Sequence, residues 1–174
     1  MKKRTILDNA QISRSLTRMS HEILEHNKGS AGIVLLGVKT RGEFLADRLQ
    51  GKIEEIDSIK VPAGNIDITG FRDDKLSAQK PTEAIDMDTS LVGSHVIIVD
   101  DVLYTGRTIR AAMDAILNQV RPAKISLAVL IDRGHRELPI RADFVGKNIP
   151  TAKEEKVNVY VEEYDGFTEV VLSE

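Results

Sequence analysis

Short apolar runs alternate with segments of helical periodicity along most of this chain. Three runs, 31–37 (AGIVLLG), 95–101 (HVIIVDD) and 125–132 (ISLAVLID), have the near-continuous apolar character of strands that are buried on both faces of a sheet. Helical patterns follow the first two runs, at 43–49 and at 108–120. This alternation predicts an α/β fold in which helices flank a mainly parallel, twisted sheet.

The two ends of the chain have their own patterns. Asp8 and Gln11 resemble a capping box with an acidic cap, and an apolar stripe then recurs at steps of three and four residues up to Gly29. The stripe consists of Ile12, Leu16, Met19 and Ile23. Near the other end, 157–163 and 168–173 are expected to form strands, which can pair as a hairpin through Asp165 and Gly166.

A polar stretch interrupts the alternation between 71 and 90. The preceding segment 65–69 alternates apolar and polar residues as a strand does, whereas 71–90 contains five Asp or Glu residues, Pro81 and few apolar side chains. Structureless loops of this length in compact domains are usually functional lids or disordered segments. We therefore predict a flexible active-site loop over 71–90.

Composition narrows the class of protein. A chain of 174 residues with 41% hydrophobic content can bury one core, so we expect a single domain over 1–174. There is no cysteine, no apolar run that would span a bilayer and no apolar block that would act as a signal peptide, which favours a cytoplasmic protein without a membrane partner. A net charge of −3 gives no global reason to expect nucleic acid, so an RNA role would need a local basic patch.

The most specific chemistry lies at the strand-to-helix junction 96–108, VIIVDDVLYTGRT. Its strand delivers Asp100 and Asp101 to the sheet edge, and a Thr-Gly turn then opens a helix. Backbone N–H groups at a helix N-terminus, with the hydroxyls of Thr105 and Thr108, suit a phosphate dianion. The carboxylates suit ribose hydroxyls or a hydrated Mg²⁺. Together they describe a site for a phosphorylated sugar, although a strand end followed by a simple helix cap is an alternative.

The complete string resembles the motif with which type I phosphoribosyltransferases bind 5-phosphoribosyl-1-pyrophosphate (PRPP). Together with GVKTRGEFLA, DITGFRDD and DRGHRELPIRADFVGKNIP, in this order, it makes nearly the whole chain similar to the family of bifunctional pyrimidine-operon regulators and uracil phosphoribosyltransferases, the PyrR family. The resemblance implies a type I phosphoribosyltransferase fold with a small hood, PRPP and uracil as substrates, and UMP and pyrophosphate as products. It also implies Mg²⁺ as cofactor, UMP-dependent binding of pyr leader mRNA, and a homodimer or larger homo-oligomer.

Catalytic residues are predicted from chemistry and resemblance together. The loop 37–42, GVKTRG, resembles the family's pyrophosphate loop, and its cationic side chains and backbone N–H groups can neutralise a departing pyrophosphate. Taken alone, the same loop could be a solvated basic turn. An arginine opens the loop that, by resemblance, folds over bound PRPP. The predicted catalytic set is Asp100, Asp101, Lys39, Arg41 and Arg72, with Mg²⁺ held by the two aspartates. The predicted PRPP- or nucleotide-binding residues are Thr40, Arg41, Asp100, Asp101, Val102, Leu103, Tyr104, Thr105, Gly106, Arg107 and Thr108.

The base pocket is predicted to involve the segment 132–150, interpreted as the hood. Related purine phosphoribosyltransferases carry an aspartate that assists the purine ring where this chain has Tyr104, which disfavours a purine acceptor and leaves no general base identified. Phe144 and Val145 correspond to purine-enzyme residues that stack on the base and bind it through the backbone. Core packing is the open alternative for Phe144. The predicted base-pocket residues are Asp132, Arg133, Phe144 and Val145.

The first predicted helix has a second candidate surface. At 100 degrees per residue, Arg14, Thr17, Arg18 and His21 lie opposite the apolar stripe. Composition alone would explain this cluster as a solvated helix face. The resemblance instead implies an RNA-binding face made of Thr17, Arg18, His21, His135, Arg136, Arg141 and Lys147. Phosphate contacts from such residues would make the binding sensitive to salt.

Three functional hypotheses remain open from the sequence. The first is a bifunctional protein that is both uracil phosphoribosyltransferase and RNA-binding regulator. The second is a UMP-sensing RNA-binding regulator with vestigial catalysis, which Tyr104 keeps open. The third is a plain salvage phosphoribosyltransferase without an RNA target.

Overall fold

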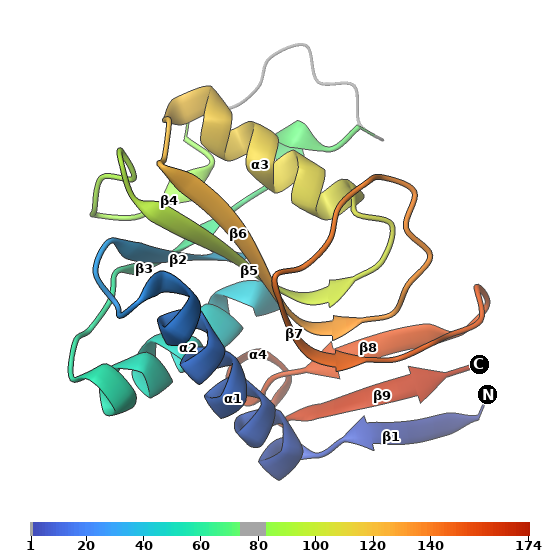
Figure 1. The fold of residues 1–174 in the computed structure, drawn as a ribbon. Coiled ribbons are helices and arrows are strands. Elements are labelled where there is room, and N and C mark those ends of the chain that lie inside the picture. Colours follow the sequence, from blue (N-terminus) through green and yellow to red (C-terminus); the bar gives the residue numbers. More distant parts are fainter. Residues whose placement is uncertain (1, 74–82) are drawn as a thin grey trace.

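The computed structural model describes residues 2–73 and 83–174, and its main layer is a six-stranded sheet (Figure 1). Its strands are β2 (Ile33–Val38), β3 (Ala63–Ile66), β4 (Ile85–Asp86), β5 (His95–Leu103), β6 (Lys124–Asp132) and β7 (Phe144–Asn148). They lie in the order β4-β3-β2-β5-β6-β7, and every pair is parallel except β3 with β4. The predicted α/β class with a mainly parallel sheet is confirmed.

Helices cover both faces of this sheet (Figure 1). The helices are α1 (Asn9–Asn27), α2 (Arg41–Asp57), α3 (Arg107–Gln119) and the short α4 (Glu162–Asp165). Leu35 belongs to the core beneath α1 and α2, whereas its neighbour Leu36 belongs to the core beneath α3. Successive strand residues thus point into different cores, which is why the strand sequences are apolar without alternation. No described helix is long and apolar enough to cross a bilayer.

The capping box at the start of α1 is confirmed. The Asp8 carboxylate accepts a hydrogen bond from the Gln11 amide at 2.8 Å, and the Asp8 amide donates to the Gln11 side chain at 2.9 Å. The predicted apolar stripe is buried. The helix ends at Asn27, because Lys28 adopts the left-handed conformation and its amide caps the last turn.

Segments from near both ends of the chain form a separate three-stranded sheet in the order β1-β9-β8. Its strands are β1 (Lys3–Leu7), β8 (Lys156–Tyr160) and β9 (Glu169–Ser173), and both pairs are antiparallel. The two later strands, β8 and β9, pair with each other as the expected hairpin, and the connection between them contains α4. The segment 132–150, predicted as the hood, contains β7, which lies at the edge of the main sheet.

The predicted loop 71–90 is only partly described, because 74–82 lie outside the described residues. A short 3₁₀ helix, Thr69–Phe71, leads into it, and β4 lies within it, where Ile85 pairs with Ile66 of β3. The predicted strand 65–69 corresponds to β3, which begins two residues earlier and ends at Ile66. The loop is therefore shorter than its polar composition indicated.

Candidate active site

The two phosphate-type loops lie side by side because their strands are neighbours. β2 and β5 run parallel from the pair Ile33 and His95 to the pair Gly37 and Val99, so the loops that follow them leave the same edge of the sheet. A Cβ added to Gly42 would lie 2.5 Å from the carbonyl oxygen of Val99, so only glycine allows this approach. The Lys39–Thr40 peptide bond in the first loop is cis.

Asp100 and Asp101 lie near the carboxyl end of β5, next to this loop. Asp100 is buried, with 6% of its surface exposed, while Asp101 is half-buried. The Asp100 carboxylate accepts a hydrogen bond from the Asp101 amide at 2.9 Å, and the Asp101 carboxylate accepts one from the Val102 amide at 2.7 Å. Burial and the neighbouring charge of Asp101 raise the pKa of Asp100 well above its usual value. A bound cation or a hydrogen-bond donor would offset this repulsion.

The N-terminus of α3 borders a cavity of about 280 Å³. Arg72, Asp73, Thr105, Arg107 and Thr108 line it. The turn residue before the helix, Gly106, has φ of 94°, and a Cβ there would lie 3.3 Å from Ile140. The cavity thus joins a helix N-terminus, two hydroxyls and two arginines, which together suit a phosphate group.

Arg107 spans one side of this cavity. Its guanidinium forms ion pairs with Asp73 at 2.6 Å and with Glu137 at 3.1 Å. It is therefore engaged by carboxylates from the segment after β3 and from the segment after β6. Arg72 lies beside the same cavity, which brings the predicted loop arginine to the phosphate side of the site.

Tyr104 stands at the centre of a cationic cluster. The guanidinium of the buried Arg133 lies over its ring, 4.1 Å from the centroid, and the His135 ring meets it edge-on at 5.9 Å. Arg133 also donates to the Thr151 hydroxyl at 3.2 Å, while Asp132 accepts from Arg136 at 2.7 Å. Side-chain contacts thus connect the carboxyl ends of β5 and β6 beside the two phosphate-type loops.

The placement of Phe144 corrects the predicted base pocket. The β6–β7 register pairs Phe144 with Ala128, whereas Asp132 pairs with Asn148, so Phe144 lies four residues before the carboxyl edge. Its ring is buried beneath α1 and meets the His26 ring edge-on at 5.6 Å. The core-packing alternative is therefore favoured for Phe144. Val145, the next residue, is likewise in mid-sheet.

Sequence reasoning missed two residues that contact the pyrophosphate-type loop. Arg41 donates to both carboxylate oxygens of Asp165, at 3.1 and 2.8 Å, and lies 5.3 Å from the centroid of the Tyr164 ring. No sequence signal links positions 124 residues apart, and the turn-like Asp-Gly pair favoured a hairpin at this point.

The predicted RNA-binding residues differ in how far they are already engaged. His21, Arg141 and Lys147 are exposed. Arg136, in contrast, donates three internal hydrogen bonds: to the carbonyl oxygens of Tyr104 (2.7 Å) and Ile140 (2.8 Å) and to the Asp132 carboxylate (2.7 Å). These bonds stabilise the connection between β6 and β7. Because they engage the guanidinium, the position of Arg136 does not support its predicted role as a phosphate contact.

The remaining three predicted RNA-binding residues also have internal partners. The Thr17 hydroxyl donates to the Ser13 carbonyl oxygen at 3.0 Å, as expected for a helical threonine. The His135 ring lies 2.5 Å from the Thr151 carbonyl oxygen. Arg18 contacts β7 and is half-exposed. None of the three side chains is fully buried by these contacts.

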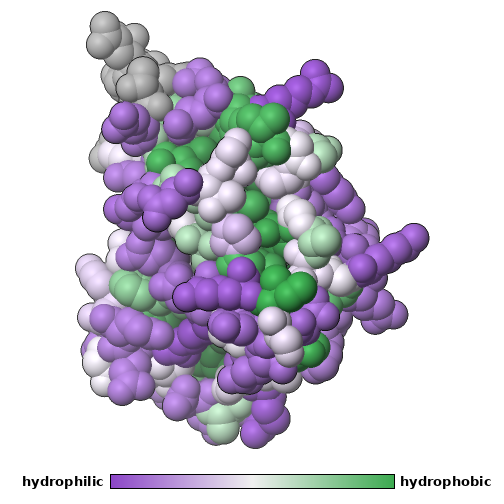
Figure 2. All heavy atoms as spheres, turned by 90° about the vertical axis from the view of Figure 1, so that its left-hand side faces the viewer, coloured by the Kyte–Doolittle hydropathy of each residue, from purple (hydrophilic) through white to green (hydrophobic). Residues whose placement is uncertain are grey.

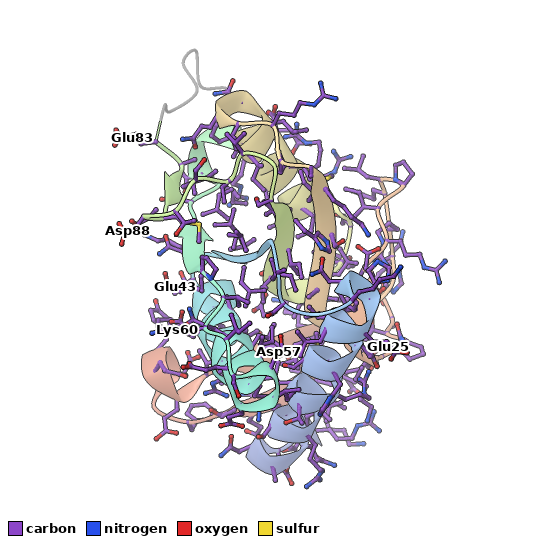
Figure 3. All side chains as sticks on the ribbon, turned by 60° about the vertical axis from the view of Figure 1, so that its left-hand side comes forward. Glu25, Glu43, Asp57, Lys60, Glu83 and Asp88 are labelled. Carbon is purple, nitrogen blue, oxygen red and sulfur yellow. The ribbon has the colours of Figure 1, made fainter. Side chains whose placement is uncertain are left out.

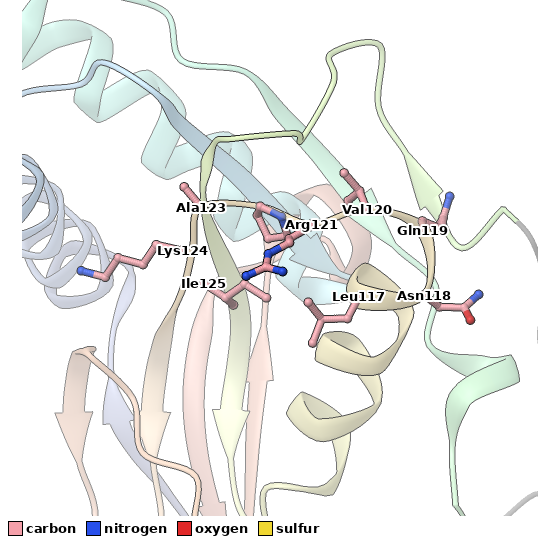
Figure 4. Close-up of a pocket in the computed structure, with 9 residues that line it drawn as sticks. Leu117, Asn118, Gln119, Val120, Arg121, Ala123, Lys124 and Ile125 are labelled. Atoms are coloured by element: carbon pink, nitrogen blue, oxygen red, sulfur yellow. The ribbon is translucent and has the colours of Figure 1, made fainter.

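Two other cavities differ from this site. One, about 680 Å³, is lined by residues 117–125, where α3 ends and β6 begins, and thus lies at the opposite edge of the sheet (Figure 4). Figure 2 shows hydrophobic residues interspersed with hydrophilic ones on one face of the molecule. A smaller one, about 230 Å³, includes Glu43, Asp47, Asp86 and Asp88, and on this flank Glu83 and Asp88 point away from the sheet (Figure 3). Its acidic lining would repel phosphates.

Comparisons with known proteins identify the family of this chain. The model of the phosphoribosyl transferase domain family matches residues 3–164. The bifunctional protein PyrR of Staphylococcus aureus (strain bovine RF122 / ET3-1) is 60% identical over 174 residues, which cover 99% of both chains, and that of strain Newman is 59% identical with the same coverage.

Solved structures agree on the fold. A hypoxanthine phosphoribosyltransferase from Trypanosoma cruzi has a TM-score of 0.77 at 22% identity, over 98% of this chain and 91% of that one. One from Staphylococcus aureus has a TM-score of 0.63 at 19% identity, over 84% and 77% of the respective chains. The present chain therefore belongs to the phosphoribosyltransferase domain family and, within it, to the bifunctional PyrR proteins.

Proposed function

We propose that this protein transfers the phosphoribosyl group of PRPP to uracil, which forms UMP and pyrophosphate, and that it binds pyr leader mRNA when UMP is bound. The observation that carries the enzymatic part is the adjacency of two phosphate-type loops on the parallel strands β2 and β5. The 60% identity to a bifunctional PyrR protein supports both parts.

PRPP would lie across the carboxyl edge of the main sheet. Its 5-phosphate fits the cavity at the N-terminus of α3, where Thr105 and Thr108 supply hydroxyls. Its ribose hydroxyls would donate to Asp100 and Asp101, and its pyrophosphate would lie against the loop 37–42. The predicted PRPP- or nucleotide-binding set also includes Thr40, Arg41, Val102, Leu103, Tyr104, Gly106 and Arg107, and the predicted catalytic set adds Lys39 and Arg72.

The reaction requires positioning and charge stabilisation. As the bond from ribose C1 to pyrophosphate breaks, uracil N1 forms a new bond to C1 and loses its proton. Positive charge develops on the ribose, beside the carboxylates of Asp100 and Asp101, and negative charge grows on the pyrophosphate, beside Lys39 and Arg41. Fixed charges of both signs in these places lower the barrier without covalent catalysis.

The two aspartates fit a magnesium ion as cofactor. Among the described residues no group of three or more His, Cys, Asp or Glu side chains could hold a metal, and Mg²⁺ bound to a phosphorylated substrate needs only one or two carboxylates. Asp100 and Asp101 would hold it, and when bound it would neutralise part of the pyrophosphate charge.

The surroundings of Tyr104 support a pyrimidine acceptor. Its ring is covered by Arg133, so this position offers a phenol and a cation where the purine enzymes offer a carboxylate. Asp132 and Arg133, which end β6, remain the proposed base-side residues. For Val145, only a contact between its backbone and the base is proposed.

The RNA-binding part would use the α1–β7 side of the molecule. His21 on α1 and Lys147 on β7 are exposed, as is Arg141 in the segment before β7, and these side chains would supply cationic or polar contacts to phosphates. Recognition of a hairpin RNA would then depend on its loop and backbone shape. A homodimer or larger homo-oligomer, which sedimentation would measure, belongs to the same proposal.

Two measurements test the proposal. Labelled uracil with PRPP and Mg²⁺ should give UMP, and Asp101→Asn should lower the rate about a hundredfold or more. If the unmutated protein forms no UMP, the enzymatic part is wrong. Titration of leader RNA with and without UMP should show tighter binding with UMP. An affinity equal to that for an unrelated hairpin would reject the regulatory part.

A further inference from the structure

Two similar ion pairs fasten α4 to α2. Arg41 meets Asp165 through Nε–Oδ2 at 3.1 Å and Nη2–Oδ1 at 2.8 Å. Arg48 meets Glu163 through Nε–Oε1 at 2.9 Å and Nη2–Oε2 at 2.8 Å. The two arginines are seven residues apart and so lie on the same side of α2. Both contacts are two-pronged, which gives them a defined geometry.

The surroundings of the two pairs differ. Arg41 is the first residue of α2 and also belongs to the pyrophosphate-type loop 37–42, whereas Arg48 lies two turns further along the helix. The Asp165 side chain is 11% exposed, against 39% for Glu163. Asp165 Oδ2 also accepts a hydrogen bond from the Val161 amide at 2.8 Å. Asp165 is therefore a fixed anchor beside the loop, while Glu163 only attaches α4.

The guanidinium of Arg41 contacts Asp165 and is also affected by the charge of Asp101 on β5. The hydrogen bond with Asp165 raises the pKa of Arg41, and the charges of Asp165 and then of Asp101 raise it further, against the opposing effect of burial. Asp165 occupies Nε and one hydrogen of Nη2. Among residues 2–73 and 83–174, Nη1 of Arg41 forms no hydrogen bond. A guanidinium has five N–H donors, so three remain for a ligand.

We propose that Asp165 is a positioning residue that holds Arg41 for pyrophosphate binding, an inference that rests on the proposed phosphoribosyl transfer. An arginine that is already ordered loses less conformational entropy when it binds an anion. The negative charge of Asp165 acts in the opposite direction, because it weakens the attraction between Arg41 and pyrophosphate. The proposal requires that the ordering outweighs this repulsion.

Calorimetric titration with magnesium pyrophosphate tests the balance without requiring turnover. Asp165→Asn keeps an oxygen that can accept from the Val161 amide but removes the ion pair, and it should weaken pyrophosphate binding about tenfold and raise KM for PRPP more than it lowers kcat. Glu163→Gln removes the ion pair with Arg48 and should change pyrophosphate affinity and KM for PRPP by less than about twofold. Equal effects of the two variants, or tighter binding by Asp165→Asn, would overturn the proposal.

A double-mutant cycle separates positioning from a general structural effect. If Asp165 acts through Arg41, Asp165→Asn should cause no further loss of pyrophosphate affinity in an Arg41→Gln background. Additive losses would overturn the proposal, and circular dichroism melts of all variants identify any that are unfolded. UMP formation by the unmutated protein is measured in parallel. Its absence counts against the proposed enzymatic function, whereas the pyrophosphate titrations decide the role of Asp165.

Discussion

Arg18 on α1 donates a hydrogen bond to the carbonyl oxygen of Val145 on β7 at 3.0 Å. The same nitrogen lies 2.6 Å from the Gly146 carbonyl oxygen, and Glu22 pairs with the other end of the guanidinium at 2.6 Å. A side chain that resemblance assigns to RNA binding thus also attaches the helix to the edge strand of the sheet.

Arg18→Gln is therefore expected to affect stability as well as RNA binding. Loss of charge-assisted hydrogen bonds from a half-exposed side chain should lower the free energy of unfolding by about 1 kcal/mol, measured in urea. His21→Gln, on an exposed position of the same helix, should stay within about 0.5 kcal/mol of the parent while it weakens RNA binding. Equal stability of the two variants would show that the Arg18 contacts contribute nothing.

Arg141 and Arg136 form a second contrast, between an exposed and an engaged arginine. Arg141→Gln should weaken leader RNA binding, reduce the salt slope of log K by roughly one unit and leave UMP formation unchanged. Arg136→Gln removes three internal hydrogen bonds beside Tyr104 and should impair UMP formation too. If Arg141→Gln lost both activities, the two surfaces would not be separate.

Two glycines of α2 should respond to alanine in opposite directions. A Cβ at Gly42 would lie 2.5 Å from the Val99 backbone, so Gly42→Ala should push the loop from β5, lower the free energy of unfolding by about 2 kcal/mol or more and reduce PRPP binding. Gly51 has open space around it, so Gly51→Ala should raise stability by about 0.5–1 kcal/mol. Thermal melts with and without PRPP measure the stability of both variants. A Gly42→Ala variant as stable as the parent would contradict the close contact between Gly42 and Val99.

His95 should make stability depend on pH. Its ring lies within hydrogen-bonding distance of Asn27 (2.9 Å) and Ser126 (2.7 Å), and burial, then the charges of Lys124 and His26, lower its pKa in the folded state. The unfolded chain therefore takes up a proton near pH 6.5 that the folded protein does not. The stability that neutral His95 contributes to the folded state is present above about pH 6.5. It is lost as the pH falls from there towards the lower pKa of His95 in the folded protein.

The comparison is with a variant that cannot titrate at this position. His95→Gln should be less stable than the parent at pH 8, because the buried hydrogen bonds are disturbed, but its stability should fall less between pH 7 and pH 5. Urea unfolding across this range provides the measurement. Parallel pH profiles for parent and variant would assign the dependence to other groups.

Local sequence pattern was sufficient for much of the fold. The apolar runs of β2, β5 and β6 and the cap at Asp8 report local periodicity and local hydrogen bonding, which the structure retains. Because parallel strands share one carboxyl edge, the adjacency of the two phosphate-type loops followed from those patterns.

Other features depend on partners that are distant in sequence. The register of β7 decides whether Phe144 meets a ligand or the core, and nothing in ADFVGKNIP encodes that register. Arg136 and Arg141 are the same residue type in one segment, so the sequence does not distinguish them. In the structure, Arg136 donates to internal acceptors, whereas Arg141 is exposed. The pair of Arg41 and Asp165 joins an early loop to a late helix, and charge pattern alone does not select one partner among many.

The pairing of β1 with β9 sets the order in which the molecule can be completed on the ribosome. Lys3 pairs with Ser173, and Leu7 shares the core beneath α1 with Val170. At 5–20 residues per second, roughly 8–30 seconds of synthesis separate the two strands. During that time β1 has no strand partner, and the helix it precedes lacks part of its packing. The packing of α1 is thus completed only after β9 has been translated.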